Sequence, residues 1–498
     1  MDKAYGDFVA LVKELYALDQ VASCIGWDEE TFMPPGAVMD RAIQKSTLQG
    51  VIHEKLTSKK ISDLIRSLEK STKLNPDARV VVREVARRHR RATSIPKELV
   101  KEIAKTESLA TEAWLKARKA KSFPQFEPML KKMMGLKAKV AEHVGYEDRP
   151  YDALLDEYEP YMKTVEVESL FSRFRDKLVP LVSKIHNCST QLNENAACGD
   201  FPIKMQDEFI RAVVKDMGYD FDHGRMDISA HPFTIGTGRD VRITVRYDEK
   251  NLRPATFAAI HEAGHGLYEQ GFLEKYYHTP LAESISLGIH ESQSRLWENI
   301  VARGMPFWKY YYPKLKAVFP AMESVPLAEF HKSINAVQRS YIRVEADEVT
   351  YNLHIMLRFE VENAIFEGKL KVHEIPSFWN ERFTNYLGLK VPDDAMGCLQ
   401  DIHWAIGAIG YFPTYSLGTI YATQLYNTVK KAIPDLEDQF AAGNFKGLLG
   451  WLRNNIHSQG KRYRATELIK KVTGEGLNED YFLKYLKQKY GKIYGLSL

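Results

Sequence analysis

Two histidines and a glutamate at residues 261–265 have the types and spacing of a metal-dependent hydrolytic site. The segment is His261-Glu262-Ala263-Gly264-His265. Side chains four residues apart on a helix share a face, so His261 and His265 can bind one Zn2+ ion with Glu262 one residue further round. Zinc would lower the pKa of a bound water and polarise a carbonyl, while Glu262 would move the water proton to the leaving amine. The pattern therefore predicts amide hydrolysis.

A catalytic zinc ion needs a third protein ligand and keeps one position open for water. The histidine that metzincins place six residues after the second is excluded, because residue 271 is glycine. The alternative is a glutamate from a following helix, and the candidates are Glu269, Glu274, Glu283, Glu291 and Glu298. We favour Glu291, because a helix over residues 287–297 would place it on one face with Ser294 and Arg295. Spacing alone does not separate it from an ordinary carboxylate on a helix face.

Helices must position most of these residues. Apolar residues at spacings of three and four predict a helix over residues 7–23, and a Pro-Pro-Gly turn separates it from a second helix over 37–56. Residues 77–121, interrupted by Pro96, predict two long helices. Helical spacing returns at Leu252, where Pro254 lies near the start of the segment that carries the histidines, and it continues to the C-terminus.

A small sheet is expected directly before the metal-binding segment. Residues 241–247 alternate apolar and polar side chains, which predicts a strand. Residues 231–236 supply a partner strand, with a turn over 236–239, so we expect an antiparallel pair. The predicted fold is mainly α: one catalytic domain over residues 1–498, with a helical half over 1–200, a sheet over 201–250 and a metal-binding helical half over 251–498.

Composition excludes several classes of protein. The 498 residues are 44% hydrophobic and 27% charged, and a net charge of +4 does not require a polyanionic partner. The arginine-rich run at 83–91 could contact nucleic acid, but a solvated helix face is favoured because no aromatic platform accompanies it. Four scattered cysteines without C-x-x-C spacing indicate a reducing compartment, and the apolar stretch 405–422 is broken by Gly and Pro. We expect a cytoplasmic protein that binds neither nucleic acid nor membrane.

Six motifs carry a resemblance to a known family. They are His231-Pro232-Phe233, Asp240-Val241-Arg242-Ile243-Thr244, His261-Glu262-Ala263-Gly264-His265, His290-Glu291-Ser292-Gln293-Ser294-Arg295-Leu296, Ile342-Arg343-Val344-Glu345-Ala346-Asp347 and Gly397-Cys398-Leu399-Gln400-Asp401-Ile402-His403-Trp404. In this order they make nearly the whole chain resemble the carboxypeptidase Taq family of metallocarboxypeptidases.

The resemblance implies a fold, an activity and a metal site. The fold is a helical body with a deep central groove, similar to neurolysin and angiotensin-converting enzyme, in which the N-terminal half covers the groove and zinc lies on its floor. The family's ligands map to His261, His265 and Glu291, and its general base maps to Glu262. One Zn2+ per chain is implied, with Co2+ able to replace it. The implied activity is removal of C-terminal amino acids from peptides with broad specificity, commonly by a homodimer.

An exopeptidase must also bind the free C-terminal carboxylate of its substrate, and a guanidinium group can do so through two hydrogen bonds. Arg343 is the first candidate; the alternative is a salt bridge to Glu345, Asp347 or a neighbouring helix. Arg242 on the predicted strand is the second, with a cross-strand charge pair as its alternative.

The oxyanion formed during hydrolysis needs a second electrophile. We nominate His403 with Tyr411 or Tyr415, although tyrosines here fit packing equally well. His231 can line the substrate groove or serve as an extended residue before proline. Two other functions remain open: an oligopeptidase that cuts inside short peptides, and a non-catalytic helical binding protein. Glu262 argues against the second, because a purely structural metal site has no use for a base.

Overall fold

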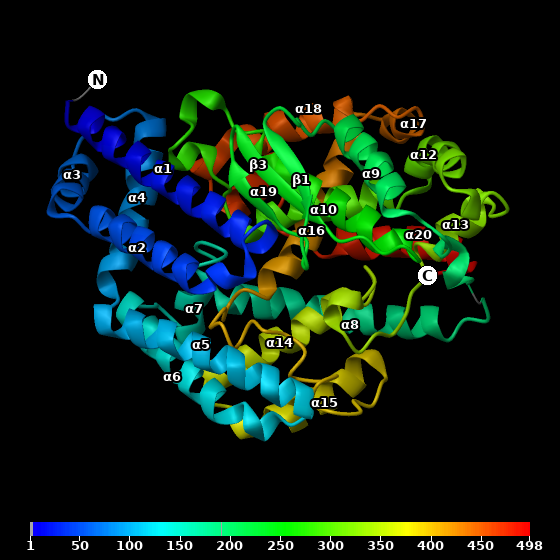
Figure 1. Ribbon diagram of the computed structural model, residues 1–498, viewed down its shortest axis with the longest axis horizontal. Helices are drawn as coiled ribbons and strands as arrows, with labels where there is room; N and C mark the ends of the chain where they lie inside the picture. Colours follow the sequence, from blue (N-terminus) through cyan, green and yellow to red (C-terminus); the bar gives the residue numbers. More distant parts are fainter. Residues whose placement is uncertain (1–2, 191) are drawn as a thin grey trace.

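Helices make up most of the computed structural model, which describes residues 3–190 and 192–498 (Figure 1). The helices of the first part are α1 (Lys3–Thr31), α2 (Val38–Leu56), α3 (Lys59–Glu69), α4 (Pro76–Ser94), α5 (Lys97–Ala120), α6 (Glu127–Val144), α7 (Pro150–Leu155), α8 (Thr164–His186), α9 (Ile203–Met217) and α10 (Leu252–Glu269). Those of the second part are α11 (Leu287–Arg295), α12 (Met305–Val318), α13 (Leu327–Ser333), α14 (Tyr351–Phe366), α15 (Ile375–Leu387), α16 (Pro413–Ala432), α17 (Leu436–Ala441), α18 (Lys446–Asn455), α19 (Ala465–Thr473) and α20 (Asp480–Tyr494). A π-helical segment, Leu296–Ala302, continues α11. The mainly α class is confirmed.

Local sequence signals set the boundaries of the N-terminal helices. The side chain of Asn75 accepts a hydrogen bond from the backbone of Ala78 (2.8 Å) at the start of α4, where Pro76 occupies the first turn. Ile95 is extended before Pro96, so α4 ends there and α5 begins. The predicted pair of long helices over 77–121 is confirmed, as are the helices on either side of the Pro-Pro-Gly turn.

The arginines of α4 bind carboxylates from several other elements. The ion pairs are Arg87 with Asp156, Arg88 with Asp19, Arg90 with Glu69 and Arg91 with Glu157. Their partners lie in α1, in α3 and in the turn after α7. The basic run therefore connects α4 to its neighbours through charge pairs.

The sheet has three strands, β1 (Gly224–Ile228), β2 (Thr234–Thr237) and β3 (Asp240–Val245), in the order β1-β3-β2. β2 and β3 form the predicted antiparallel hairpin, with Gly236 opposite Val241. β1 pairs with β3 in parallel, so the sheet is mixed and the expectation of a purely antiparallel sheet is wrong. β1 was missed because only Met226 among its five residues is buried, which leaves no clear alternation in the sequence.

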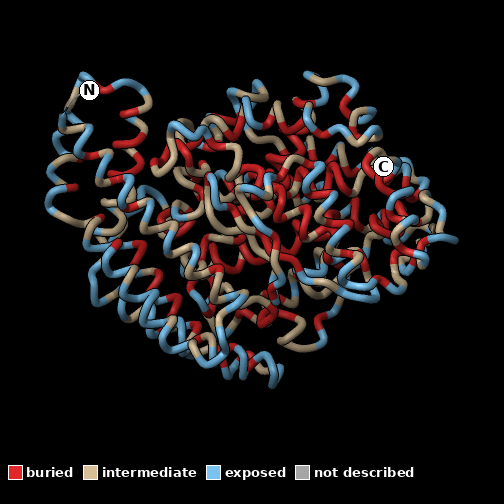
Figure 2. The backbone as a smooth tube through the Cα atoms, turned by 45° about the horizontal axis from the view of Figure 1, so that its top comes forward, coloured by how far each residue is buried: buried red, intermediate tan, exposed pale blue. Residues whose placement is uncertain are grey.

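The described residues form two hydrophobic cores. The larger one extends from α5 to α20 and includes Val241, Ile243 and Val245 of β3, which pack over α10 (Figure 1). The smaller one joins α1, α3 and α4 through Phe8, Val12, Leu15, Ile61, Ile65, Leu68, Val81, Val82 and Val85. Figure 2 shows the buried segments in the middle of the molecule and the exposed segments around its margin. The central groove and the three-part division of the chain remain predictions.

Along the described residues, no helix combines the length and the apolar character that crossing a membrane requires.

Candidate metal and catalytic site

Helix α10 presents the two histidines from one side. Its N-terminus is capped by Asn251, whose side chain accepts a hydrogen bond from the backbone of Arg253 (3.1 Å). Apolar residues on its other faces, such as Ile260 and Leu267, are fully buried. With that packing fixed, His261 and His265 project together from the remaining face, as their spacing predicts.

Helix α11 brings the third residue to the same place. Its N-terminus is held twice: Ser286 Oγ accepts from the backbone of Ile289 (3.0 Å), and the buried carboxylate of Glu159 accepts from the backbone of Gly288 (3.0 Å). A carboxylate is well placed there because the helix dipole is positive at this end. Glu291, one turn further on, is only 6% exposed.

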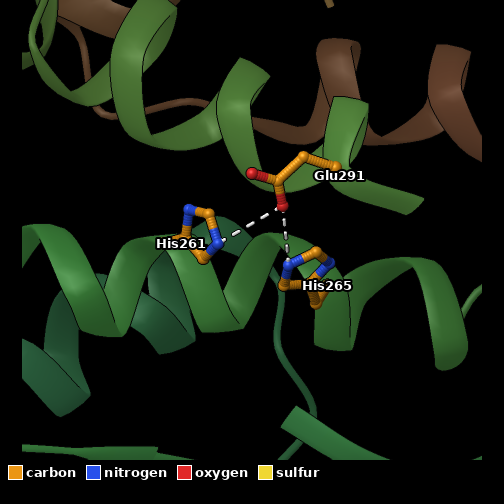
Figure 3. A group of neighbouring side chains, drawn as sticks. All are labelled: His261, His265 and Glu291. Atoms are coloured by element: carbon orange, nitrogen blue, oxygen red, sulfur yellow. Dashed lines mark ion pairs between the residues drawn. The ribbon is translucent and has the colours of Figure 1, made fainter. Parts of the chain in front are cut away.

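The side chains of His261, His265 and Glu291 converge (Figure 3). Glu291 Oε2 lies 3.5 Å from His261 Nε2 and 3.3 Å from His265 Nε2. The three candidate ligand atoms all lie within 4.8 Å of one another. Among the described residues, this is the one group of three or more His, Cys, Asp or Glu side chains that could hold a metal ion. Two imidazole nitrogens and one carboxylate oxygen suit a divalent transition-metal ion. The residues therefore fit the predicted metal.

Each of the three side chains is also held from behind. His261 Nδ1 lies 2.9 Å from Glu298 Oε2, and His265 Nδ1 is hydrogen-bonded to His290. Arg295 Nε donates to Glu291 Oε1 (2.6 Å), which leaves Oε2 directed at the histidines. Partners of this kind fix ring orientation and strengthen ligands.

The charges of this cluster shift its pKa values in opposite directions. Burial would raise the pKa of Glu291, but Arg295 and His261 hold it well below its usual range. Burial lowers the pKa of His265 to about 3, with His290 contributing. Against the same effect of burial, Glu291 and Glu298 raise the pKa of His261 to about 9. Glu291 is therefore an anion at neutral pH, and His265 is neutral.

Two glycines set the spacing between the helices. A Cβ atom at Gly264 of α10 would lie 2.7 Å from the Cα of Ser294, and one at Gly418 of α16 would lie 2.6 Å from the Cβ of Glu291. Only glycine permits such approaches. Helix α11 is therefore in close contact with a backbone on each side of the residue that completes the cluster.

Glu262 lies beside the cluster, under strand β2. It is 7% exposed, and its Oε2 lies 2.6 Å from the hydroxyl of Thr234. Burial raises its pKa, although His261 opposes the shift. A carboxylate that is desolvated and oriented in this way is suited to accept a proton.

Arg343 lies in a second buried cluster and is 6% exposed. Its Nε and Nη2 donate to Asp401 Oδ1 (3.0 and 2.8 Å), and its Nη1 donates to the hydroxyl of Tyr351 (2.7 Å). The alternative of an internal salt bridge is therefore observed, but its partner is Asp401 and not Glu345 or Asp347. Asp401 Oδ2 also accepts from Arg358 Nε (2.7 Å), so one carboxylate serves two guanidinium groups.

His403 and the two nominated tyrosines border Arg343. His403 Nε2 lies 3.4 Å from the hydroxyl of Tyr415, and the rings of Tyr411 and Tyr415 have centroids 5.2 Å apart. The Tyr415 ring centroid is 5.2 Å from Arg343 Cζ. Burial lowers the pKa of His403 to about 4, although Asp401 opposes the shift, so the imidazole is neutral. Burial raises the pKa values of both tyrosine hydroxyls, and the negative charge of Glu291 raises them further.

A short chain of contacts connects the two clusters. The guanidinium of Arg295, which binds Glu291, lies over the ring of Tyr351 at 4.5 Å, and the hydroxyl of Tyr351 accepts from Arg343. The structure thus brings His261, His265, Glu291, Glu262, Arg343, His403, Tyr411 and Tyr415 into one polar region.

Arg242 and His231 have different surroundings. Arg242 donates through Nε and Nη2 to Asp240 (2.7 and 2.8 Å), two residues earlier on the same strand, so the alternative of a cross-strand charge pair is wrong. Its guanidinium stacks on Trp27 of α1, 4.4 Å from the ring centroid, and lines a cavity of about 480 Å³ between α1 and the sheet. His231 is exposed, in the segment before β2.

Several residues of the site were not identified as such from the sequence. They are His290, Glu269, Arg295, Glu298, Arg358, Asp401 and Thr234. Glu269 and Glu298 had been considered only as third ligands. Asp401 stands two residues before His403 in one of the six motifs, which indicates that it belongs to the site. The motif does not indicate that its partner is Arg343.

Comparison with known proteins gives one consistent result. The family model described as carboxypeptidase Taq (M32) metallopeptidase matches residues 7–490. Thermostable carboxypeptidase 1 of Thermus thermophilus is 38% identical over 507 residues, covering 99% of each chain, and that of Pyrococcus furiosus is 39% identical over 491 residues, covering 97% of each. The crystal structure of the M32 carboxypeptidase from Deinococcus radiodurans aligns with a TM-score of 0.97 and 37% identity, over 99% of this chain and 100% of that one.

Proposed function

The chain belongs to the carboxypeptidase Taq (M32) family and is a metallocarboxypeptidase, and from that premise we propose that it uses zinc and Glu262 to remove C-terminal amino acids from peptides of varied sequence. The observation that carries the proposal is the convergence of His261, His265 and Glu291 beside the buried carboxylate of Glu262. A purely structural metal site would not need that carboxylate.

His261, His265 and Glu291 would hold the metal ion, and their two nitrogens and one oxygen suit zinc or cobalt. When bound, the ion supplies Lewis acidity, which makes a water more acidic and a carbonyl more electrophilic. Arg295 and Ser294 hold Glu291 by bonds of 2.6 and 2.9 Å, so the carboxylate keeps its orientation when the ion enters.

Glu262 would act as the proton carrier. Its carboxylate accepts a proton from the attacking water and passes it to the leaving amine nitrogen. Burial raises its pKa, which makes it a stronger base than an exposed glutamate. The hydroxyl of Thr234, 2.6 Å away, fixes the position of Oε2 and ties it to strand β2.

Arg343 is the better candidate for binding the substrate's C-terminal carboxylate. Arg343 and Arg358 share the single carboxylate of Asp401, so a positive charge is left over. Arg343 uses three of its five N–H groups in the bonds that the described residues make to it. Arg242, by contrast, is balanced one-to-one by Asp240.

His403, Tyr411 and Tyr415 would stabilise the oxyanion. The pKa shifts keep the tyrosine hydroxyls protonated and the imidazole neutral, so each can offer a hydrogen bond without carrying charge. If Arg343 binds the C-terminal carboxylate, these neighbouring donors would lie near the bond that an exopeptidase cuts. Arg242 and His231 remain candidates for contacts with other parts of the peptide.

The proposal is tested with a blocked dipeptide and its C-terminal amide. The purified protein should release the terminal residue from the free acid only, and a chelator should abolish release until zinc is restored. Glu262→Gln should lower kcat about 10²–10⁴-fold, with the metal content unchanged. Equal cleavage of the amide would indicate an oligopeptidase, and full activity of Glu262→Gln would refute the assignment of the base.

A further inference from the structure

The two histidines of the cluster differ in what supports them. Glu298, a carboxylate, lies 2.9 Å from His261 Nδ1, whereas the atom bound to His265 Nδ1 is the Nδ1 of a second imidazole, His290. We propose that His290, held by Glu269, is a positioning residue that fixes His265 in its metal-binding tautomer. The inference rests on the proposed metal site.

Both supporting groups come from the helices that carry the ligands. Glu269 lies four residues after His265 on α10, so both side chains project from one face of that helix. His290, which immediately precedes Glu291 on α11, reaches this face and places its Nε2 2.9 Å from Glu269 Oε1. The side chains of His290 and Glu269 are 16% and 13% exposed, and the ring of Tyr268 packs on His290 with centroids 5.4 Å apart.

The hydrogen bonds determine where the protons lie. A carboxylate only accepts, so the Nε2 of His290 carries a hydrogen and donates it to Glu269. The other nitrogen of a neutral His290, Nδ1, then offers a lone pair. His265 Nδ1 must therefore be the donor between the two rings. That leaves the lone pair of His265 on Nε2, the atom that faces Glu291 Oε2 at 3.3 Å.

The opposite tautomer of His265 is disfavoured by the same geometry. With its hydrogen on Nε2, His265 would turn a lone pair on Nδ1 toward the lone pair of His290 Nδ1. Through the ring of His290, the Glu269 carboxylate thus determines that the lone pair of His265 lies on Nε2. His290 is bonded to His265 Nδ1 and not to the Nε2 that faces Glu291, so its proposed effect on the metal is exerted through His265.

Metal affinity is the direct readout of this arrangement. His290→Leu removes the acceptor for His265, and it should weaken zinc binding about 10–100-fold, measured by competition with a chelating indicator. His457→Leu is the matched control: His457 is buried and also packs on Tyr268 (5.0 Å), but it bonds to Gln293. It should leave zinc affinity within about threefold of that of the unmodified protein, whatever it does to stability.

A conservative variant provides the rescue. In His290→Gln the amide oxygen can accept from His265 while the amide nitrogen donates to Glu269, so most of the affinity should return. Glu269→Leu leaves the acceptor ring of His290 in place, so it should weaken binding less than His290→Leu, and it covers the case in which the latter fails to fold. The absorption spectrum of the cobalt-loaded protein should change in His290→Leu and revert in His290→Gln.

The outcomes separate this inference from the proposed function. Unchanged zinc affinity in both His290→Leu and Glu269→Leu, with an active unmodified enzyme, overturns the inference alone. An equal loss in His457→Leu overturns it as well, because the effect would then be one of general packing. An unmodified protein that binds no zinc overturns both, while one that binds zinc with the predicted variant order but cleaves no peptide overturns only the proposed function.

Discussion

The two buried polar clusters of the site have opposite unbalanced charges. The first, which we call the metal cluster, contains His261 and His265 with four carboxylates and two guanidinium groups, from Glu262, Glu269, Glu291, Glu298, Arg295 and Arg303. The second, the arginine cluster, contains Arg343 and Arg358 around Asp401, with His403 at its edge. Metal binding requires both histidines to be neutral, so His261 would lose its proton when an ion binds. In that protonation state the metal cluster has an excess of negative charge, and the arginine cluster has an excess of positive charge.

That difference indicates what each cluster receives. A buried charge is costly unless it is paired, so an excess of either sign marks the place where an external partner completes the balance. A divalent cation would balance the charge of the metal cluster, and a carboxylate would balance that of the arginine cluster. A peptide with a free C-terminus and a bound metal ion together would neutralise the site.

The largest expected effect comes from removing the one anion of the arginine cluster. Asp401→Ala leaves two buried guanidinium groups without a counter-charge, so the free energy of unfolding should fall by about 3–5 kcal/mol, measured by chemical denaturation. Asp240→Ala is the control, because its pair with Arg242 is partly exposed (51% for Asp240) and should contribute less than about 1 kcal/mol. An equal loss of unfolding free energy in Asp401→Ala and Asp240→Ala would contradict the difference in burial and charge balance between their ion pairs.

The pH dependence of stability tests whether His403 is neutral. Its pKa is lowered to about 4, against about 6.5 in the unfolded chain, so the unfolded state binds more protons between these values. The unfolding free energy should therefore be unaffected above pH 6.5 and should fall as the pH drops toward 4, by up to about 3 kcal/mol from this residue. His403→Gln should flatten that part of the profile.

His331 is the control for that experiment. Burial lowers its pKa to about 4 as well, but it lies on α13. His331→Gln should flatten the stability profile similarly while peptidase activity stays unchanged, whereas His403→Gln should lower kcat. A loss of activity in both variants would contradict a specific catalytic role for His403.

The excess positive charge should also appear in substrate selection. Arg343→Lys keeps the charge but loses the planar fork, so the preference for a free acid over its amide, as a ratio of kcat/KM values, should fall about 10–100-fold. Arg242→Lys should leave this ratio unchanged, because Asp240 already occupies that guanidinium. If Arg242→Lys changes the ratio and Arg343→Lys does not, the two assignments must be exchanged.

The smallest effect is expected outside both clusters. Arg90 of α4 pairs with Glu69 while 62% of its side chain is exposed, so Arg90→Ala should change the free energy of unfolding by less than about 1 kcal/mol. The activity of Arg90→Ala should be unchanged. Neither the unmodified protein nor this variant should bind a single-stranded oligonucleotide measurably at physiological salt. Salt-sensitive oligonucleotide binding that Arg90→Ala weakens would revive the alternative of a binding protein.

The metal cluster was more predictable from the sequence than the arginine cluster, for a geometric reason. His261 and His265 lie four residues apart on one helix, and Glu291 lies on the next, so local periodicity nearly determines the face. Arg343 and Asp401 are 58 residues apart, and their pairing depends on how a 3₁₀ turn packs against a distant loop. The sequence could nominate Arg343, but it could not identify its partner.

The same distinction holds for the fold. The helices flanking Pro96 follow from local signals, whereas β1, with one buried residue, forms by docking alongside β3. The contact of His290 with His265 also depends on long-range packing. The position of His290 next to Glu291 is visible in the sequence, but its contact with His265 depends on the distance between α10 and α11.

That distance is set at Gly264, where α11 touches the backbone of α10, and α11 is held from its other side by the backbone of α16 at Gly418. Arg295 and Ser294 hold the side chain of Glu291, and its helix is in contact on both sides, so the carboxylate has little freedom to adjust to a larger or smaller ion. Discrimination between ions by radius is therefore expected to be a property of backbone packing. Adding one methyl group at Gly418 should alter which metal the enzyme prefers without changing a single ligand.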